Sequence, residues 1–232
     1  MKLVNIKEIT GTLQLKSGLH IGAGDTEMRI GGTDNPVVKH PHTNEPYIPG
    51  SSLKGKTRSL LELSSGLMGM THGAPLGIKE YIKLEGEDKK TCKAILSLFG
   101  ASGADADEKN EIGVTRLSFA DAPLSEYWKR KAMVSHLAFT EVKSENSINR
   151  IKGTAQNPRF IERVPAETEF SFSITLKILQ GDQGLEDLLF KGLKLLEQDA
   201  LGGSGSRGYG KIKFLFDQPE IQAKFDNVSP LV

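Results

Sequence analysis

Alternating apolar and polar residues mark four segments of the chain as β-strands, because a strand turns successive side chains to opposite faces. The pattern is clearest in residues 165–179, where Phe170, Phe172 and Ile174 alternate with polar neighbours. The other three predicted strands are 4–16, 113–120 and 211–216. Apolar residues at helical spacing predict helices in three further segments: 49–65, 88–99 and 185–200.

The coarse order of these elements is strand, helix, strand, strand, helix, strand. This order predicts an α+β fold with a ferredoxin-like or RRM-like (βαββαβ) core and large insertions in its loops. A length of 232 residues suits one domain, 1–232. The proline-containing segment 218–232 is expected to be a loose tail.

A glycine-rich stretch, LGGSGSRGYGKIKF at 201–214, links the last predicted helix to the last strand. Dense glycines allow positive φ and close approach of another backbone. Residues 203–208 spell G-x-G-x-x-G, but a dinucleotide site needs a strand before and a helix after it, and the order here is reversed. No Gly-Lys-Ser/Thr follows, so a P-loop is excluded as well. Residues 207–214 match RNP1 in part, with Lys211 in place of an aromatic residue.

Two interpretations of the glycine-rich stretch stay open at this point. It is either a tight helix-to-strand turn or a loop whose free amides, together with Arg207, hold a phosphodiester backbone.

The predicted helix 49–65 carries Lys54, Lys56 and Arg58 in its first turns. Helix N-termini favour anions, so these cations are unfavourable there unless an anion docks at the same end. A solvated charged face is the alternative. Ser51 or Ser52 is the expected N-cap.

Residues 139–165 are too polar to form core and predict an insertion or an extended hairpin that projects from the body. A surface loop with scattered charge is the alternative. The basic residues of this segment are Lys143, Arg150, Lys152, Arg159 and Arg163.

A long loop rich in Gly, Pro and Asn, residues 26–50, follows the first strand, and long loops are usually functional or disordered. It contains Asp34 before Asn-Pro, where ordinary turn chemistry competes with a functional role. His20 fits a buried core histidine or a functional one. His40 and His42 have no third ligand at fixed spacing, so a metal site there is weakly supported.

Composition narrows the class of protein. A net charge of +1 does not indicate nucleic-acid binding, which would require basic residues to gather on one face. The single cysteine, Cys92, excludes an internal disulfide and a Cys-based zinc cluster, and is expected to be buried. No signal peptide or membrane-spanning apolar run is present, so we expect a cytoplasmic protein with no membrane partner.

Four strings together resemble RAMP-superfamily CRISPR-associated proteins. They are PGSSLKGKTRSLLE at 49–62, ENSINRIKGTA at 145–155, VPAETEFSFSI at 164–174 and the glycine-rich stretch. The likeness is nearest to the repeated backbone subunit of the type III-A (Csm) interference complex. It covers nearly the whole chain, and the combination in this order is specific although each string alone is not.

This resemblance implies an RRM-like palm with an inserted hairpin, the thumb, within about residues 139–165. It implies copies that stack into a filament on guide (CRISPR) RNA beside other Csm-complex subunits. It also implies cleavage of complementary single-stranded target RNA at regular intervals by an endonuclease that depends on a divalent cation, Mg²⁺ or Mn²⁺.

The resemblance also assigns residues. Asp34 is the implied catalytic residue and a candidate metal ligand; whether it orients the 2′-hydroxyl, deprotonates it or holds a cation stays open. Arg150 and Lys152 are implied to contact RNA from the thumb. The implied guide contacts are His20, Lys54, Lys56, Arg58, Gly202, Gly203, Ser204, Gly205, Ser206, Arg207 and Gly208.

Three other functions compete with this one. The first is a guide-binding scaffold without cleavage. The second is a stand-alone guide-processing RAMP endonuclease, for which His20 is the candidate catalytic residue. The third, a small-molecule enzyme, is disfavoured because the dinucleotide and P-loop motifs both fail in context.

Overall fold

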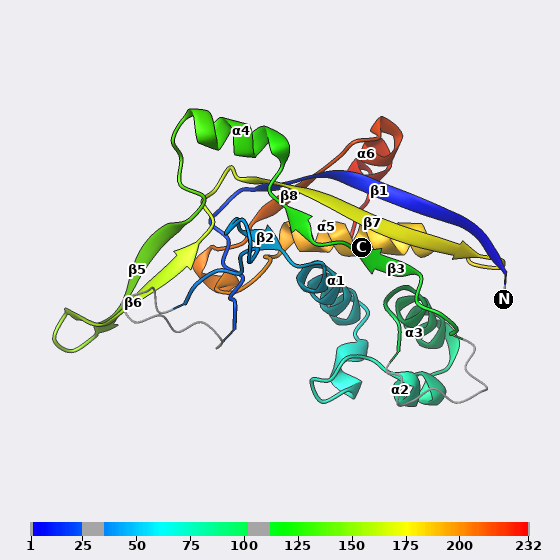
Figure 1. Ribbon diagram of the computed structural model, residues 1–232. Helices are drawn as coiled ribbons and strands as arrows, with labels where there is room; N and C mark the ends of the chain where they lie inside the picture. Colours follow the sequence, from blue (N-terminus) through cyan, green and yellow to red (C-terminus); the bar gives the residue numbers. More distant parts are fainter. Residues whose placement is uncertain (1, 25–34, 102–111, 232) are drawn as a thin grey trace.

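The computed structural model describes residues 2–24, 35–101 and 112–231, which fold into a mixed α+β structure with antiparallel sheets (Figure 1). The strands are β1 (Leu3–Leu15), β2 (Tyr47–Ile48), β3 (Leu117–Phe119), β4 (Ala122–Pro123), β5 (Glu141–Asn149), β6 (Thr154–Arg163), β7 (Glu169–Leu179) and β8 (Ile212–Phe216). The helices are α1 (Gly50–Ser64), α2 (Ile78–Lys83), α3 (Gly86–Phe99), α4 (Glu126–Val134), α5 (Leu185–Gln198) and α6 (Pro219–Asp226), with 3₁₀ helices η2 (Leu67–Met70) and η4 (Gly205–Arg207).

The main sheet has four antiparallel strands in the order β3-β7-β1-β8. Leu13 on β1 lies opposite Phe170 on β7 and Phe214 on β8, so the apolar faces of the three strands coincide. Helices α1, α3 and α5 cover this face, and the core lies between helices and sheet (Figure 1). The alternation in the sequence therefore placed the core strands correctly, and Cys92 on α3 is buried as expected.

The start of α1 differs from the prediction. Pro49 is the N-cap, and neither Ser51 nor Ser52 caps the helix. The amide of Gly50 instead donates to Oδ1 of Asp121 at 2.8 Å. The anion at this end of α1 is thus the carboxylate of Asp121. The presence of Lys54, Lys56 and Arg58 in the first turns of α1 is therefore no evidence that an external anion docks there.

The segment predicted to be a loose tail contains α6, so that prediction is wrong for residues 219–226. Pro219 occupies the first turn, where a proline costs no hydrogen bond. Ile221 and Phe225 are buried against the core, and this burial holds the helix in place.

Strands β5 and β6 form a separate two-stranded hairpin that extends away from the main sheet (Figure 1). Nearly all its side chains beyond the base are exposed, which explains the polar composition of residues 139–165. The hairpin base lies beside the chain segment that follows α5. No helix among the described residues is long and apolar enough to cross a bilayer.

Candidate nucleic-acid interface

The glycine loop, which we define as residues 202–208, is an exposed turn between α5 and β8. Gly202 has φ +73°, and a Cβ atom there would lie 2.4 Å from the carbonyl oxygen of His20. The amide of Gly203 donates to that same oxygen at 2.9 Å. Glycine is therefore required where the loop passes the end of β1.

Several amides of the glycine loop point to no acceptor. Within the described part of the chain, the N–H groups of Gly202, Ser204, Gly205 and Ser206 donate no hydrogen bond. A loop of exposed, unpaired amides is a suitable binding surface for phosphate oxygens.

The partial likeness to RNP1 does not extend to its stacking aromatics, because Tyr209 and Phe214 are both buried. The hydroxyl of Tyr209 donates to Oε1 of Glu145 on β5 at 2.7 Å. Cations of Lys143 and Arg163 lie 4.7 Å and 4.9 Å from the centre of its ring. Burial, reinforced by Glu145, raises the pKa of Tyr209. Tyr209 thus fastens the hairpin base to the glycine loop.

Arg207 is half-exposed and already has an anionic partner. Its Nε lies 3.1 Å from Oε2 of Glu145, and its guanidinium also donates to the hydroxyl of Ser204. A phosphate that binds Arg207 therefore competes with Glu145.

His20 connects the glycine loop to the hairpin. Its Nδ1 lies 2.7 Å from the carbonyl oxygen of Glu162 on β6. Because a carbonyl only accepts, Nδ1 carries the proton, which leaves Nε2 for another partner when the ring is neutral.

Asp34, the implied catalytic residue, lies outside the described residues. Residues 20–23 and 35–39 pair with each other and form what we call the loop stem. Its hydrogen bonds run from Val38 N to Ile21 O at 2.9 Å and from Ala23 N to Pro36 O at 3.2 Å. The first residue of the second stem segment, Asn35, follows Asp34 directly in sequence.

The early cations of α1 have different surroundings. Lys56 forms an ion pair of 2.6 Å with Asp199, just before the glycine loop. This ammonium lowers the pKa of Asp199, while burial acts in the opposite direction. Lys54 has no ion pair among the described residues, and burial and the charge of Arg58 lower its pKa. It lines a cavity of about 700 Å³ between α1, α2 and α3.

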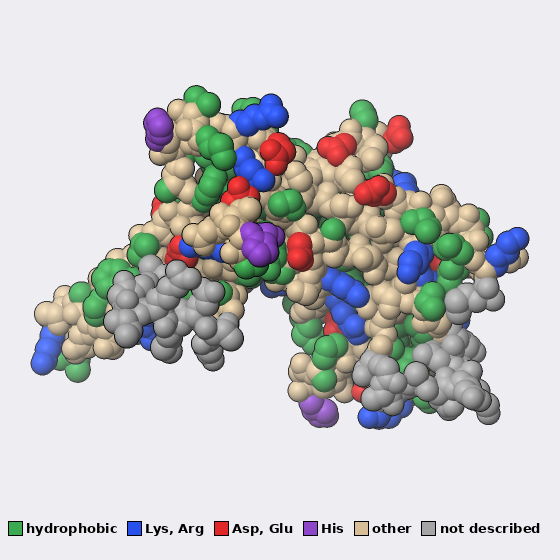
Figure 2. Space-filling model, viewed as in Figure 1, with side chains coloured by type: hydrophobic (Ala, Val, Ile, Leu, Met, Phe, Trp, Pro, Cys, Tyr) green, Lys and Arg blue, Asp and Glu red, His purple; other side chains and the backbone are tan. Residues whose placement is uncertain are grey.

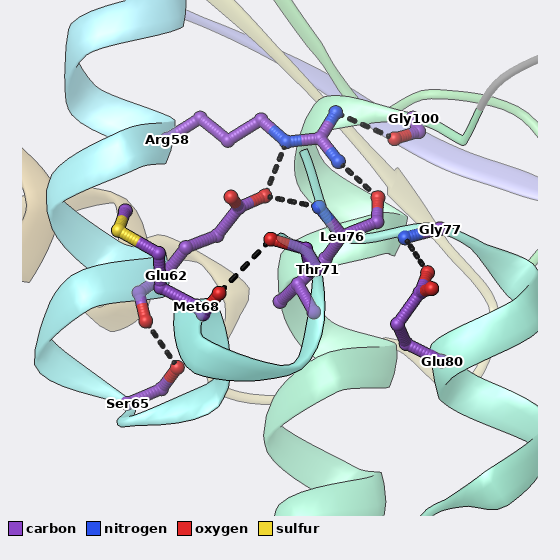
Figure 3. A network of polar contacts seen from close by, with 9 residues as sticks. All are labelled: Arg58, Glu62, Ser65, Met68, Thr71, Leu76, Gly77, Glu80 and Gly100. Carbon is purple, nitrogen blue, oxygen red and sulfur yellow. Dashed lines mark hydrogen bonds and ion pairs between the residues drawn. The ribbon is translucent and has the colours of Figure 1, made fainter. Parts of the chain in front are cut away.

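Arg58 is the centre of an internal network (Figure 3). Its guanidinium binds Glu62 at 2.7 Å and donates to the carbonyl oxygens of Gly100 and Leu76 at 3.0 Å and 2.5 Å. These bonds join α1 to the chain before α2 and after α3. The guide contact implied for Arg58 stays a prediction, and the structure gives this side chain a structural role.

Arg150 and Lys152 are exposed in the turn between β5 and β6, at the far end of the hairpin from the glycine loop. On the face drawn in Figure 2, basic and acidic side chains are interspersed. His40 and His42 contact each other through their rings, and no group of three or more His, Cys, Asp or Glu residues in the described ranges is arranged to hold a metal ion.

The sequence reasoning missed the acidic partners at this surface: Asp121, Glu145, Glu162 and Asp199. Each is held by a residue far away in the chain, so no local pattern marks it. A weak signal existed for Glu162, which follows two apolar residues, Phe160 and Ile161, where the polar hairpin returns to the body.

A model of the RAMP superfamily matches residues 12–213. The match covers most of the chain, which therefore belongs to the RAMP superfamily.

Relatives define the family more closely. The CRISPR system Cms endoribonuclease Csm3 of Methanothermobacter thermautotrophicus is 42% identical over 225 residues, covering 89% of this chain and 82% of that protein. Its namesake from Streptococcus thermophilus is 42% identical over 219 residues, covering 92% and 89%. The one from Enterococcus italicus is 38% identical over 224 residues and covers 94% of both. The chain belongs to the Csm3 family.

One solved structure agrees with this assignment, and a second shares the fold. A crystal structure of the Csm3–Csm4 subcomplex of the type III-A CRISPR-Cas interference complex contains a chain that is 26% identical, with a TM-score of 0.55 and 99% of both chains covered. A type III-B Cmr-beta structure in the apo state shares the fold at 15% identity, with a TM-score of 0.56 and coverage of 91% and 98%.

Proposed function

We propose that this chain is a repeated backbone subunit of a type III-A CRISPR ribonucleoprotein that binds guide RNA and cleaves complementary target RNA at regular intervals. One observation carries the proposal. A run of hydrogen bonds from Gly203 to His20, Glu162 and Asn35 joins the glycine loop, the end of β1, the hairpin and the loop stem. The glycine loop and His20 bind guide RNA, the hairpin contacts RNA at its turn, and the loop stem is next in sequence to Asp34, the residue that cuts.

The main sheet and its helices form a ferredoxin-like, RRM-like palm within a single RAMP domain, and the β5–β6 hairpin is its thumb. The strand order β3-β7-β1-β8 supports this view, as does the chain order of the main-sheet strands and two of the helices that cover them: β1, α1, β3, β7, α5, β8. The thumb carries Arg150 and Lys152 to RNA at its exposed turn.

Guide RNA binds through the free amides of the glycine loop, His20 and the cations of α1. Among the described residues, Lys56 and Arg207 beside this surface already pair with carboxylates of the chain, so one copy binds RNA weakly, and copies aligned on one RNA bind tightly through many phosphate contacts. Further copies of the chain and other Csm-complex subunits, including a Csm4, complete the particle. The crystallised Csm3–Csm4 subcomplex supports this partner.

Cleavage uses the RNA itself as the source of the nucleophile. The 2′-oxygen bonds to the adjacent phosphorus as the bond from phosphorus to the 5′-oxygen breaks. The 2′-hydroxyl gives up its proton to Asp34 or to water, and the leaving 5′-oxygen takes up a proton from water, so the products are a cyclic phosphate and a 5′-hydroxyl. Much of the acceleration arises from holding these atoms in line. Asp34 orients the 2′-hydroxyl or removes its proton.

The requirement for a divalent cation is inferred from the resemblance alone, because no group of three or more metal-ligating side chains is found among the described residues. Chelation with EDTA and restoration by Mg²⁺ or Mn²⁺ tests the requirement in the assembled particle.

Asp34→Ala in the assembled complex tests the function. We expect target cleavage to be lost and target binding to be kept. Retained cleavage would remove Asp34 from the mechanism, and a wild-type complex that binds but does not cut would favour the scaffold. Specific cutting of repeat RNA by the isolated protein would favour guide processing through His20.

A further inference from the structure

We propose that Glu162 is a positioning residue for RNA cleavage, which fixes the loop stem beside Asp34 to the return strand of the hairpin. The inference rests on the function proposed above, because it assumes that residues near the loop stem act on the RNA.

All the polar groups of Glu162 bind the loop stem. Its amide donates to the carbonyl oxygen of Asn35 at 3.2 Å, and its carbonyl oxygen accepts from Nδ1 of His20 at 2.7 Å. Its carboxylate accepts from the amide of Val37 at 2.9 Å and from Nζ of Lys39 at 2.6 Å. One residue of β6 therefore contacts both segments of the stem.

The carboxylate of Glu162 is well suited to hold a fixed geometry. The residue is only 7% exposed, and a buried charge is retained only when it is paired and hydrogen-bonded. Burial by itself would raise the pKa of Glu162, but hydrogen bonds from Lys39, Val37 and Thr140 outweigh it and lower the pKa. The group is thus ionised at neutral pH.

The neighbours of Glu162 on β6 do not share this role. Arg163 turns to Glu141 at 2.6 Å, and Ile161 contributes only a backbone bridge to Asn35. The two carboxylate oxygens of Glu162 are each occupied, one by Lys39 and the other by Val37. The carboxylate also accepts a hydrogen bond from Thr140, so all its partners are internal and it acts through the stem.

The second segment of the stem begins at Asn35, which follows Asp34 directly in the sequence. A displacement of about 1 Å in a catalytic arrangement can lower a rate by about 100-fold. Because Glu162 lies on β6, its contacts hold the hairpin and the stem as one unit, so the hairpin sets the position of residues 35–39.

Glu162→Gln in the assembled complex tests this. Glutamine keeps an oxygen for the amide of Val37 but removes the charge that holds Lys39. We expect the single-turnover cleavage rate, at saturating complex, to fall about 10- to 100-fold. Guide loading and the Kd for target RNA should stay within about twofold, since no RNA contact is removed.

Glu141→Gln is the matched control, because it makes the same chemical change in the same hairpin. Glu141 is half-exposed, pairs with Arg163 and makes no contact with the loop stem. Its complex should cleave at the wild-type rate. Lys39→Met removes the Lys39–Glu162 pair from the other side and should lower the rate as Glu162→Gln does.

Three outcomes overturn the inference. The first is a wild-type cleavage rate in Glu162→Gln when Asp34→Ala is inactive, and the second is an equal loss of cleavage rate and target affinity in Glu162→Gln. The third is a Glu162→Gln variant that does not fold together with a wild-type cleavage rate in Lys39→Met. Active Asp34→Ala would instead refute the proposed function, so the two failures are distinguishable.

Discussion

The main effect of replacing Arg58 with alanine should be a loss of folding stability, and not a direct loss of guide-RNA binding. The guanidinium is 17% exposed and Glu62 is 4% exposed, so their pair is largely withdrawn from water. The same Glu62 oxygen also accepts from the amide of Leu76 at 3.2 Å (Figure 3). Arg58→Ala leaves this carboxylate without its cation and leaves the carbonyl oxygens of Leu76 and Gly100 without a charged donor.

Removing one partner of a buried ion pair costs about 3–5 kcal/mol. For a chain of this size each kcal/mol lowers Tm by about 2–4 °C, so the expected fall is roughly 6–20 °C. Calorimetry and urea unfolding of the purified subunit measure it. Replacing both partners, Arg58→Met with Glu62→Leu, should restore most of the stability, because no unpaired charge remains buried.

Lys54→Ala is the control. Lys54 lies one turn earlier on α1 and has no ion pair in the described part of the chain, so its loss should change the unfolding free energy by less than about 0.5 kcal/mol. It should weaken guide loading nonetheless. If Arg58→Ala stays within about 1 kcal/mol of wild type and loses guide binding as Lys54→Ala does, the structural argument is wrong.

Two further predictions concern stability. Gly210→Ala should cost about 3 kcal/mol or more, because strain at φ +71° adds to a Cβ placed 1.9 Å from the oxygen of Leu201. Gly208→Ala, at φ +84° in open space, should cost only about 1–2 kcal/mol, and equal melting of the two would contradict this. Burial raises the pKa of Glu186, but hydrogen bonds from two lysines, one of them Lys224, outweigh it and lower the pKa. The ionised form therefore stabilises the fold above the ordinary pKa of 4.5 and loses this effect as the pH falls through the lower folded value. The Tm deficit of Glu186→Gln at neutral pH should close as the pH falls below 4.5 and passes through the lowered folded pKa, and a constant deficit would refute the linkage.

The core was predictable from the sequence because its signal is local. Phe170, Phe172 and Ile174 alternate within one strand, and burial of one sheet face requires that period. The first turn of α1 was not predictable, because the partner of the Gly50 amide is Asp121, 71 residues away. Helix α6 differs from the predicted loose tail because a proline also fits the first turn of a helix, and Pro219 occupies that place.

The candidate site likewise has a part that a local sequence pattern predicts and a part that it does not. The glycine loop was predictable as a turn because its glycines are needed for the turn itself, and its contact with RNA stays a prediction. Glu162 was not found, because what distinguishes it is a set of contacts with His20 and residues 35–39 that only the folded chain brings together. The RNP1 likeness misled because a motif specifies residue types and not exposure, and Tyr209 turned inward to Glu145.

The pairing of Lys56 with Asp199 and of Arg207 with Glu145 affects how this surface responds to ionic strength. A phosphate that reaches either cation exchanges places with a carboxylate and displaces few small ions. Counterion release, which makes RNA affinity fall with salt, therefore comes mainly from the cations that begin unpaired. Affinity for RNA should depend on salt less steeply than the number of lysines and arginines on the chain implies.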